Sequence, residues 1–306
     1  MTMAIFRNLL PVIIYFLVVS FSSAQEPDPL IITYNPYRLA SLADAQDAAD
    51  QELKIGVKAY GLTLRYPALS KNDRVAIYNG LALDYLHFSY RDWDIQQRSY
   101  HPLDLYGLNY TLFCYGKLGK NWQVDIALMP GIYSDFKNFS GDDFTLQGYL
   151  ALLHRGREGF AYGIGAAYLN IWGEPQVLPV IKLYWQLSST YALDIDLPGQ
   201  ARINYDFLDG LELGLSGHLA GNYYHIGDDN FAGDEKSHHV KLSNGTAGVY
   251  MAIRVSGQLF WMVEFGDTFR RRLEFYRREQ EALESFDLKN GFYFSTRLDL
   301  RPRVIY

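Results

Sequence analysis

The sequence predicts an all-β protein: a transmembrane, antiparallel, up-and-down β-barrel of about 12 strands, with 14 also possible. Three observations predict this fold: long segments of alternating apolar and polar residues, connections that alternate between short and long, and an amphipathic last strand that ends in an aromatic residue. The composition agrees, since 49% of the 306 residues are hydrophobic and 25 are tyrosine, yet mean hydropathy is slightly negative. A barrel exposes apolar residues only at every second position, so its hydropathy averages near zero.

The composition also excludes several classes of protein. A chain this apolar and aromatic buries enough surface to fold, so it is not disordered. It has no stretch of about 18 uncharged apolar residues, so a bundle of membrane helices is excluded. The net charge of −6 argues against nucleic acid as a partner. The single Cys114 leaves no internal disulfide.

Residues 1–24 are predicted to be a secretory signal peptide. Arg7 supplies the positive charge, Leu9 to Phe21 forms the apolar segment, and Ser22-Ser23-Ala24 places small residues at a cleavage site. The apolar segment is short for a membrane anchor, which needs about 20 residues. Export fits a protein in the outer membrane of a Gram-negative bacterium.

The segment after the signal peptide differs from the rest of the chain. Residues 25–52 are predicted to form an N-terminal periplasmic segment or linker, although residues 31–34 could add one short strand. The barrel itself is expected over residues 53–306, where strand-like segments follow one another. The domain order is therefore signal peptide, linker and barrel.

The clearest predicted strand is Trp122 to Ile132, where apolar and polar or small residues alternate throughout. The same alternation runs through residues 106–114, 160–168 and 211–220. Such segments exceed the usual strand length of about 5–6 residues. They match the ~9–11 residues with which a tilted strand crosses a bilayer.

The connections between the predicted strands differ in length. Short turns are expected at 118–121, 155–159, 187–190, 208–210 and 256–258. Longer links are expected at 91–101, 135–143, 227–238 and 268–287. Short turns at one rim and long loops at the other are typical of outer-membrane barrels. For 268–287, a short helix at the mouth and an extended hairpin both fit the pattern.

The C-terminal segment alternates up to its final residue. Phe294, Leu298, Leu300 and Tyr306 share one face, which is the form of signal that the barrel-assembly machinery reads. These residues are therefore predicted to form the assembly signal. The alternative is an edge strand of a soluble protein that happens to end in tyrosine.

A family resemblance supports the barrel. The stretch Leu128-Met129-Pro130-Gly131-Ile132-Tyr133-Ser134-Asp135-Phe136 is followed by Trp172, Leu178-Pro179, Trp185 and Tyr191 to Pro198. This pattern resembles a family of uncharacterised bacterial outer-membrane β-barrels, classified as a domain of unknown function, over roughly residues 53–306. The resemblance implies the fold, and it implies no substrate and no catalytic residue.

The last strand and the first long strand are expected to lie side by side and to place charges in the lumen. If Ile55 and Val57 face lipid, Lys54 and Lys58 turn inward. Charged side chains select ions in pores, or they pair with one another across a plugged interior. The predicted pore-lining residues are Lys54, Lys58, Asp125, Arg297, Asp299, Arg301 and Arg303.

His87 and Ser89 form a candidate catalytic pair. They share one face of a predicted strand, and Asn109 on the next strand could orient the histidine. Ser as nucleophile with His as base would make a lipid hydrolase on the barrel wall. This requires Leu86 and Phe88 to point inward.

The function expected from the sequence is a passive channel or transporter for a small solute, or a structural membrane component, and not an enzyme. The alternatives are the lipid hydrolase and a soluble periplasmic ligand-binding β-barrel. No Gly-rich phosphate loop or cluster of cysteine ligands appears, so no cofactor or metal is predicted. The expected partners are the lipid bilayer and lipopolysaccharide, the barrel-assembly machinery and a small solute.

Overall fold

A computed structural model of the protein describes residues 30–41, 54–71, 74–91, 103–170, 175–227, 238–276 and 282–300. For residues 35–41, 54, 67–71, 90–91 and 282–284 it describes the backbone alone. The predicted signal peptide, Arg301, Arg303 and Tyr306 lie outside the described residues.

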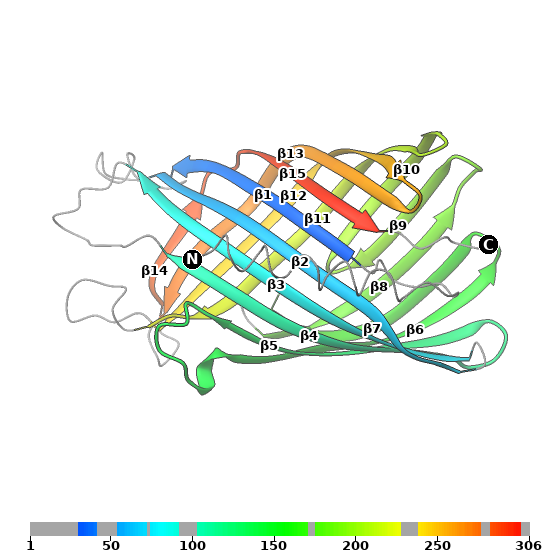
Figure 1. Cartoon of the computed structure of the whole chain (residues 1–306), viewed down its shortest axis with the longest axis horizontal. Helices are drawn as coiled ribbons and strands as arrows, with labels where there is room; N and C mark the ends of the chain where they lie inside the picture. Colours follow the sequence, from blue (N-terminus) through cyan, green and yellow to red (C-terminus); the bar gives the residue numbers. More distant parts are fainter. Residues whose placement is uncertain are drawn as a thin grey trace.

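The described residues form the predicted all-β antiparallel barrel (Figure 1). The strands are β1 (Leu30–Ser41), β2 (Lys54–Lys71), β3 (Val75–Arg91), β4 (Asp104–Lys117), β5 (Trp122–Ser134), β6 (Phe144–Arg157), β7 (Phe160–Leu169), β8 (Gln176–Gln186), β9 (Tyr191–Leu197), β10 (Gln200–Leu208), β11 (Leu211–His225), β12 (His239–Ser256), β13 (Leu259–Tyr276), β14 (Ala282–Leu288) and β15 (Phe292–Leu300). One 3-10 turn, η1 (Gly141–Asp143), precedes β6. No helix in these ranges is long and apolar enough to cross a membrane.

The barrel closes because β1 pairs with β15, and β15 pairs with β13. β14 and β15 occupy one position in the wall, because both pair with the same edge of β13. β15 pairs with Leu259 to Asp267, and β14 pairs with Arg271 to Tyr276. The fifteen described strands therefore fill fourteen positions. The count is even, as bacterial barrels require, and it matches the larger of the two predicted numbers.

The barrel wall begins at Leu30, not at residue 53. β1 lies between β2 and β15, so part of the segment assigned to a linker is a wall strand. The expectation that the first long strand pairs with the last is therefore wrong. The sequence contained a signal for this strand, the short apolar run at residues 31–34. Without β1 the described wall would hold an odd number of strands.

The two ends of the barrel differ as predicted. Short connections follow β4, β6, β8, β10 and β12, and all lie at the end where the chain finishes, here called the turn end (Figure 1). The opposite end, the loop end, carries the longer connections. The described parts of 268–287, Thr268–Tyr276 of β13 and Ala282–Asp287 of β14, are extended and pair with each other from Arg271 onward, and Arg272 Nε donates to Asp287 Oδ1 at 2.7 Å. One connection breaks the pattern: at the loop end, β9 and β10 are joined by Pro198 and Gly199 alone.

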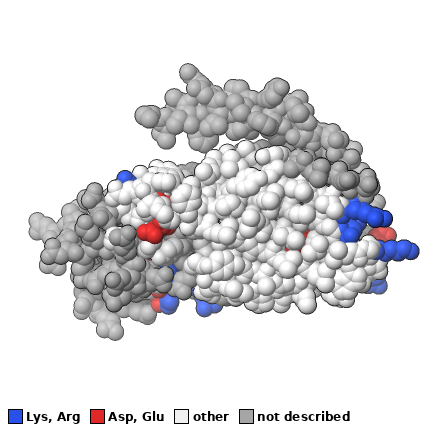
Figure 2. All heavy atoms as spheres, turned by 90° about the horizontal axis from the view of Figure 1, so that it is seen from below, with Lys and Arg blue, Asp and Glu red and all other residues white. Residues whose placement is uncertain are grey.

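The outer face of the wall is apolar. On β5, Trp122, Ile126 and Leu128 are exposed, while Gln123 and Asp125 are buried in the interior, so the predicted alternation is confirmed. Figure 2 shows a middle band of the visible face in which charged side chains are scarce, with lysine and arginine toward the ends. This distribution is the one expected of a barrel in a bilayer.

Two rows of aromatic side chains border this band. The loop-end row consists of Tyr34, Tyr60, Tyr85, Tyr106 and Phe136, whose neighbouring ring centroids lie 4.9, 5.8, 5.2 and 5.7 Å apart. The turn-end row consists of Trp122, His154, Tyr162, Phe160, Trp185, Tyr191 and Tyr205. Aromatic girdles at both interfaces are typical of membrane barrels.

The loop-end half of the interior is packed with apolar side chains. β5 and β11 meet across the barrel, where the Asp135 N–H donates to the His225 carbonyl at 3.2 Å. The interior apolar cluster consists of Ile55, Val57, Leu86, Phe88, Leu103, Leu105, Tyr133, Tyr224, Ile226, Val240, Leu273, Phe275 and Leu288. This half of the barrel is a solid core.

Candidate functional site

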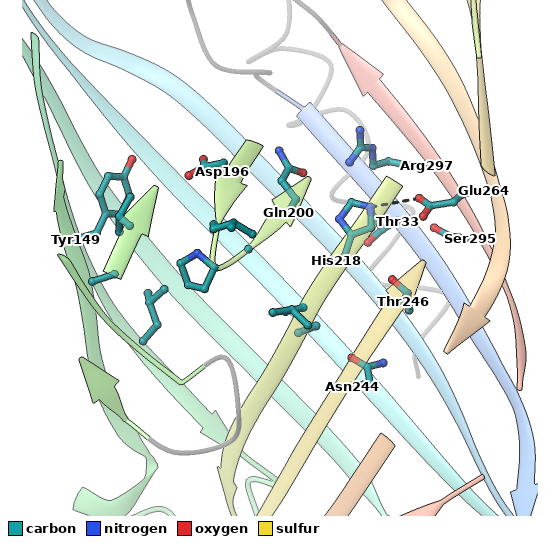
Figure 3. Close-up of a pocket in the computed structure, with 18 of the residues that line it drawn as sticks. Thr33, Tyr149, Asp196, Gln200, His218, Asn244, Thr246, Glu264, Ser295 and Arg297 are labelled. Carbon is teal, nitrogen blue, oxygen red and sulfur yellow. Dashed lines mark ion pairs between the residues drawn. The ribbon is translucent and has the colours of Figure 1, made fainter. Parts of the chain in front are cut away.

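A cavity of 530 Å³ lies on the turn side of the interior apolar cluster. On β11, β12 and β13 the cavity residues His218, Thr246 and Glu264 all lie nearer the turn end than the cluster residues of the same strands. Figure 3 shows Tyr149 and Asp196 on one side of the cavity, and Glu264, Ser295 and Arg297 on the other. The site is assembled from opposite walls of the barrel.

Glu264 on β13 is the centre of a buried polar group. It accepts hydrogen bonds from Ser216 Oγ at 2.5 Å and from the Tyr293 hydroxyl. His218 Nε2 lies 3.5 Å from its other oxygen, the ion pair drawn in Figure 3. A buried carboxylate is costly without such partners, so these three side chains hold a negative charge at the cavity wall.

Lys182 on β8 is the centre of a second group. Its ammonium lies 3.7 Å from Asp125, 3.5 Å from Asp196 and 4.9 Å from the ring centre of Tyr149. Asp125 also accepts a 2.6 Å hydrogen bond from Gln123, whose carbonyl oxygen accepts from Arg155 at 3.0 Å. A chain of polar side chains thus runs from the cavity toward the turn end.

Arg297 and Asp299 lie inside the barrel on β15. Arg297 lines the cavity, and its Nε lies 2.7 Å from Asp299, whose side chain is 0% exposed. Asp125 and Arg297 thus enter the candidate site, and Asp299 supports it. Their charges are matched by neighbouring side chains rather than arranged as a ring of one sign.

The predicted orientation of β2 is wrong. Ile55 and Val57 belong to the interior apolar cluster, and Lys58 is exposed on the outer face. The side chain of Lys54 lies outside the description, but its backbone has the outward parity of Lys58. The error arose because apolar positions were assigned to lipid, whereas in the loop-end half the interior is apolar as well. Lys58 therefore does not share the interior with Arg297.

The described residues of the predicted assembly signal lie on the face of β15 that is turned away from the cavity. Phe294, Leu298 and Leu300 alternate with Arg297 and Asp299, so they face outward. Apart from Thr296, the described outward face of β15 is thus apolar. Their role in assembly stays a prediction.

The structure places His87 and Ser89 on the outer face, because Leu86 and Phe88 point inward. His87 Nδ1 lies 2.8 Å from Asp104 Oδ1, which also accepts from the Tyr85 hydroxyl at 2.8 Å. The predicted partner Asn109 is buried in the interior, so Asp104 orients the histidine instead. Ser89 Oγ lies 3.5 Å from the Gly56 carbonyl.

A polar clamp holds the loop end closed. His225 Nδ1 lies 2.9 Å from Asp143 Oδ1, and Asp135 Oδ2 accepts from the Gly227 N–H at 3.0 Å. These contacts fasten the β5–β6 connection to the end of β11. In the described ranges no group of three His, Cys, Asp or Glu residues could hold a metal ion.

The sequence interpretation missed Lys182, Asp196, His218 and Glu264 as members of one site. A signal existed for Lys182, because it interrupts the apolar segment from Val177 to Trp185. A charged residue in such a strand points inward. Its meeting with Asp125, which is three strands away, is decided only by the closure of the barrel.

The closed wall, its apolar outer band and the internal polar cavity define a barrel of the outer-membrane type. The chain belongs to a family described as a domain of unknown function (DUF6268), whose model matches residues 36–301. The family assignment agrees with the resemblance noted in the sequence. No curated protein matches the chain.

Two solved barrels are similar to the chain. The COG4313 outer membrane channel from Pseudomonas putida F1 is 12% identical, with a TM-score of 0.48 and coverage of 90% of this chain and 96% of the channel. A deletion mutant of the TodX monoaromatic hydrocarbon channel is 10% identical, with a TM-score of 0.39 and coverage of 91% of each chain.

Proposed function

We propose that the protein is a passive channel or transporter for a small solute in the outer membrane of a Gram-negative bacterium. The observation that carries this proposal is the 530 Å³ cavity inside the closed wall, lined by Lys182, Glu264 and Arg297. A barrel with a purely structural role would not require charged side chains around an internal cavity. The volume is in the range of sites for small molecules.

The outer face supports a membrane location and argues against a soluble periplasmic barrel. Leu146, Ile164 and Val177 are exposed apolar side chains between the two aromatic rows. In water they would favour aggregation, whereas lipid solvates them. The bilayer and its lipopolysaccharide are the partners that this surface fits, and the apolar face of β15 is what the assembly machinery would read.

Two adjacent alanines on β7 provide a test of the channel. Ala167 lines the cavity, whereas Ala166 is exposed on the outer face. We expect proteoliposomes with the wild-type protein to take up radiolabelled hexanesulfonate, a small charged amphipathic solute, faster than empty liposomes. Ala167→Trp should block this uptake because indole fills the cavity, and Ala166→Trp should leave it unchanged. Uptake equal to that of empty liposomes would refute the channel.

A second candidate function is supported by a separate observation. The carboxylate of Asp104 orients His87 on the outer face, and Ser89 lies two residues along the same face. In an ester hydrolase, Ser89 Oγ would attack the carbonyl carbon, and His87 would take its proton and pass it to the leaving alkoxide. Water would then release the acyl group from Ser89 and restore the hydroxyl.

The hydrolase is tested with phospholipid in mixed micelles. We expect Ser89→Ala to abolish any release of fatty acid, and Asp104→Asn to lower it strongly, because the histidine loses its charged partner. Ser295→Ala, inside the barrel, is the control and should have no effect. Hydrolysis that persists in Ser89→Ala would exclude the pair, as would an inactive wild-type protein.

A further inference from the structure

The wall of the barrel has a low segment at the β9–β10 hairpin. β8 pairs with β9 only over Ile181–Gln186, although it continues along β7 to Gln176. On the other side, β11 pairs with β10 as far as His218 but follows β12 to His225. Its two neighbours, β8 and β11, therefore continue further toward the loop end than the hairpin does.

This low segment lies within the apolar band. Ile181 and Leu197 form the last β8–β9 pair, and Val177 lies four residues further along β8. At about 3.3 Å per residue and a tilt of about 40°, four residues rise by roughly 10 Å. Val177 is still an outward apolar side chain, 75% exposed. The loop-side end of the hairpin thus lies about 10 Å nearer the turn end than Val177, and Val177 itself still lies in the apolar band.

The cavity reaches the top of the hairpin. Leu197, Pro198 and Gly199 line it, together with Leu219 and Ala220 of β11 and Val180 of β8. Leu219 and Gly199 are also joined directly, since the Leu219 N–H donates to the Gly199 carbonyl at 2.9 Å. Most side chains at this edge of the cavity are therefore apolar, with Gln200 as a polar exception, whereas the inner wall carries His218, Glu264 and Arg297.

The direct path from the cavity to the loop end is filled. The interior apolar cluster lies above the cavity, with Phe88 and Tyr224 at 0% exposure. The β5–β11 contact and the clamp at His225 and Asp143 lie on the loop side of this cluster. Among the described strands, the short β9–β10 hairpin leaves a gap between β8 and β11, and residues that line the cavity border this gap.

We propose that the cavity opens sideways into the lipid through a window between β8 and β11, above the β9–β10 hairpin, and that it takes small amphipathic molecules. This inference rests on the proposed channel function and specifies its substrate class. The apolar edge admits the hydrocarbon part of the cargo from the outer leaflet. The polar wall binds one hydrogen-bonding end group, such as a carboxyl or hydroxyl.

The window can be located by fluorescence quenching in liposomes. A bimane label is attached at Ala220→Cys in a Cys114→Ser background and compared with Ala247→Cys, exposed on the outer face of β12, and with Ala151→Cys, buried in the interior. Lipid with a doxyl group on its acyl chain should quench the label at 220 as strongly as at 247, and much more than at 151. Quenching at 220 by aqueous iodide alone would overturn the window.

A second label covers the case in which the Ala220 variant fails to fold. Gln200→Cys, at the start of β10, lies at the opposite edge of the opening and should behave in the same way. Quenching requires no transport, so its outcome is separate from that of the uptake assay. A channel without a window would pass hexanesulfonate and show no lipid quenching, and a window without a channel would do the reverse.

Decanoate, a small amphipathic anion, tests the proposed substrate class. Decanoate added to the labelled liposomes should shift the bimane emission at residue 220 and leave that at residue 247 unchanged, whereas arabinose at the same concentration should shift neither. Arg297→Gln should weaken the decanoate effect, because the carboxylate of decanoate loses a cationic partner at the polar wall. Equal shifts at 220 and 247 would mean that decanoate only enters the bilayer, and would overturn the assignment.

Discussion

The two halves of the barrel interior are built from the same strands and have opposite chemistry. Toward the loop end, inward positions carry Val57, Phe88 and Leu273, which pack together in one buried apolar core. Toward the turn end, inward positions of the same barrel carry Lys182, Glu264 and Arg297, which line a cavity. One alternation of residues can therefore produce an apolar core and a polar cavity inside a single wall.

Removing a large side chain from the loop-end core should have the largest effect on stability. Phe88 is 0% exposed, so Phe88→Ala should lower the free energy of unfolding by about 3–5 kcal/mol through lost burial and a new cavity. Leu83→Ala, on the outer face of the same strand, is the control and should cost clearly less. Urea titration of tryptophan fluorescence in vesicles measures both. Equal losses would contradict a solid core.

Changing the charge in the turn-end half should have a smaller effect on stability and a clear effect on ion selectivity. Glu264→Gln keeps the shape but weakens the bonds from Ser216 and Tyr293, so it should cost about 1–3 kcal/mol. It should also shift the reversal potential in a salt gradient toward anions, because the cavity loses a negative charge. Asp209→Asn, at the exposed β10–β11 turn, should change neither quantity. An unchanged reversal potential would place Glu264 outside any ion path.

The exposed β13–β14 hairpin should contribute least. Arg272 and Asp287 form an ion pair outside both halves of the interior, with half of the Arg272 side chain accessible to solvent. Arg272→Ala should lower stability by less than about 1 kcal/mol, since exposed pairs are weak and screened by salt. The same urea titration at low and high salt checks this value. A loss as large as that of Phe88→Ala would show that the hairpin belongs to the loop-end core.

Much of the fold followed from local patterns. Alternation predicted the faces of β4, β5, β7, β11 and β15, because each side of such a strand meets one environment only. The sorting of turns and loops was also predicted, since turn residues act over a few positions. β2 failed for the opposite reason: both of its faces are partly apolar, so hydrophobicity alone could not tell lipid from core.

The candidate site was predicted in part. Asp125, Arg297 and Asp299 were expected to point inward, and they do. Lys182, the partner of Asp125, was missed because it lies three strands away. Asp104 was missed as the partner of His87 because it lies at the beginning of β4, across a register that no local pattern specifies. Pairs between strands depend on how the sheet is staggered.

The sequence alone specified an all-β chain with amphipathic strands, an apolar outer surface and a set of inward charges. Those properties are local, because period-2 alternation and turn chemistry act over a few residues. Only the closed barrel decided that β1 completes the wall, that one half of the interior is solid, and that Lys182, Glu264 and Arg297 surround a common cavity. Closure joins residues that are far apart in the chain, and the stagger of the strands sets which side chains meet across the interior.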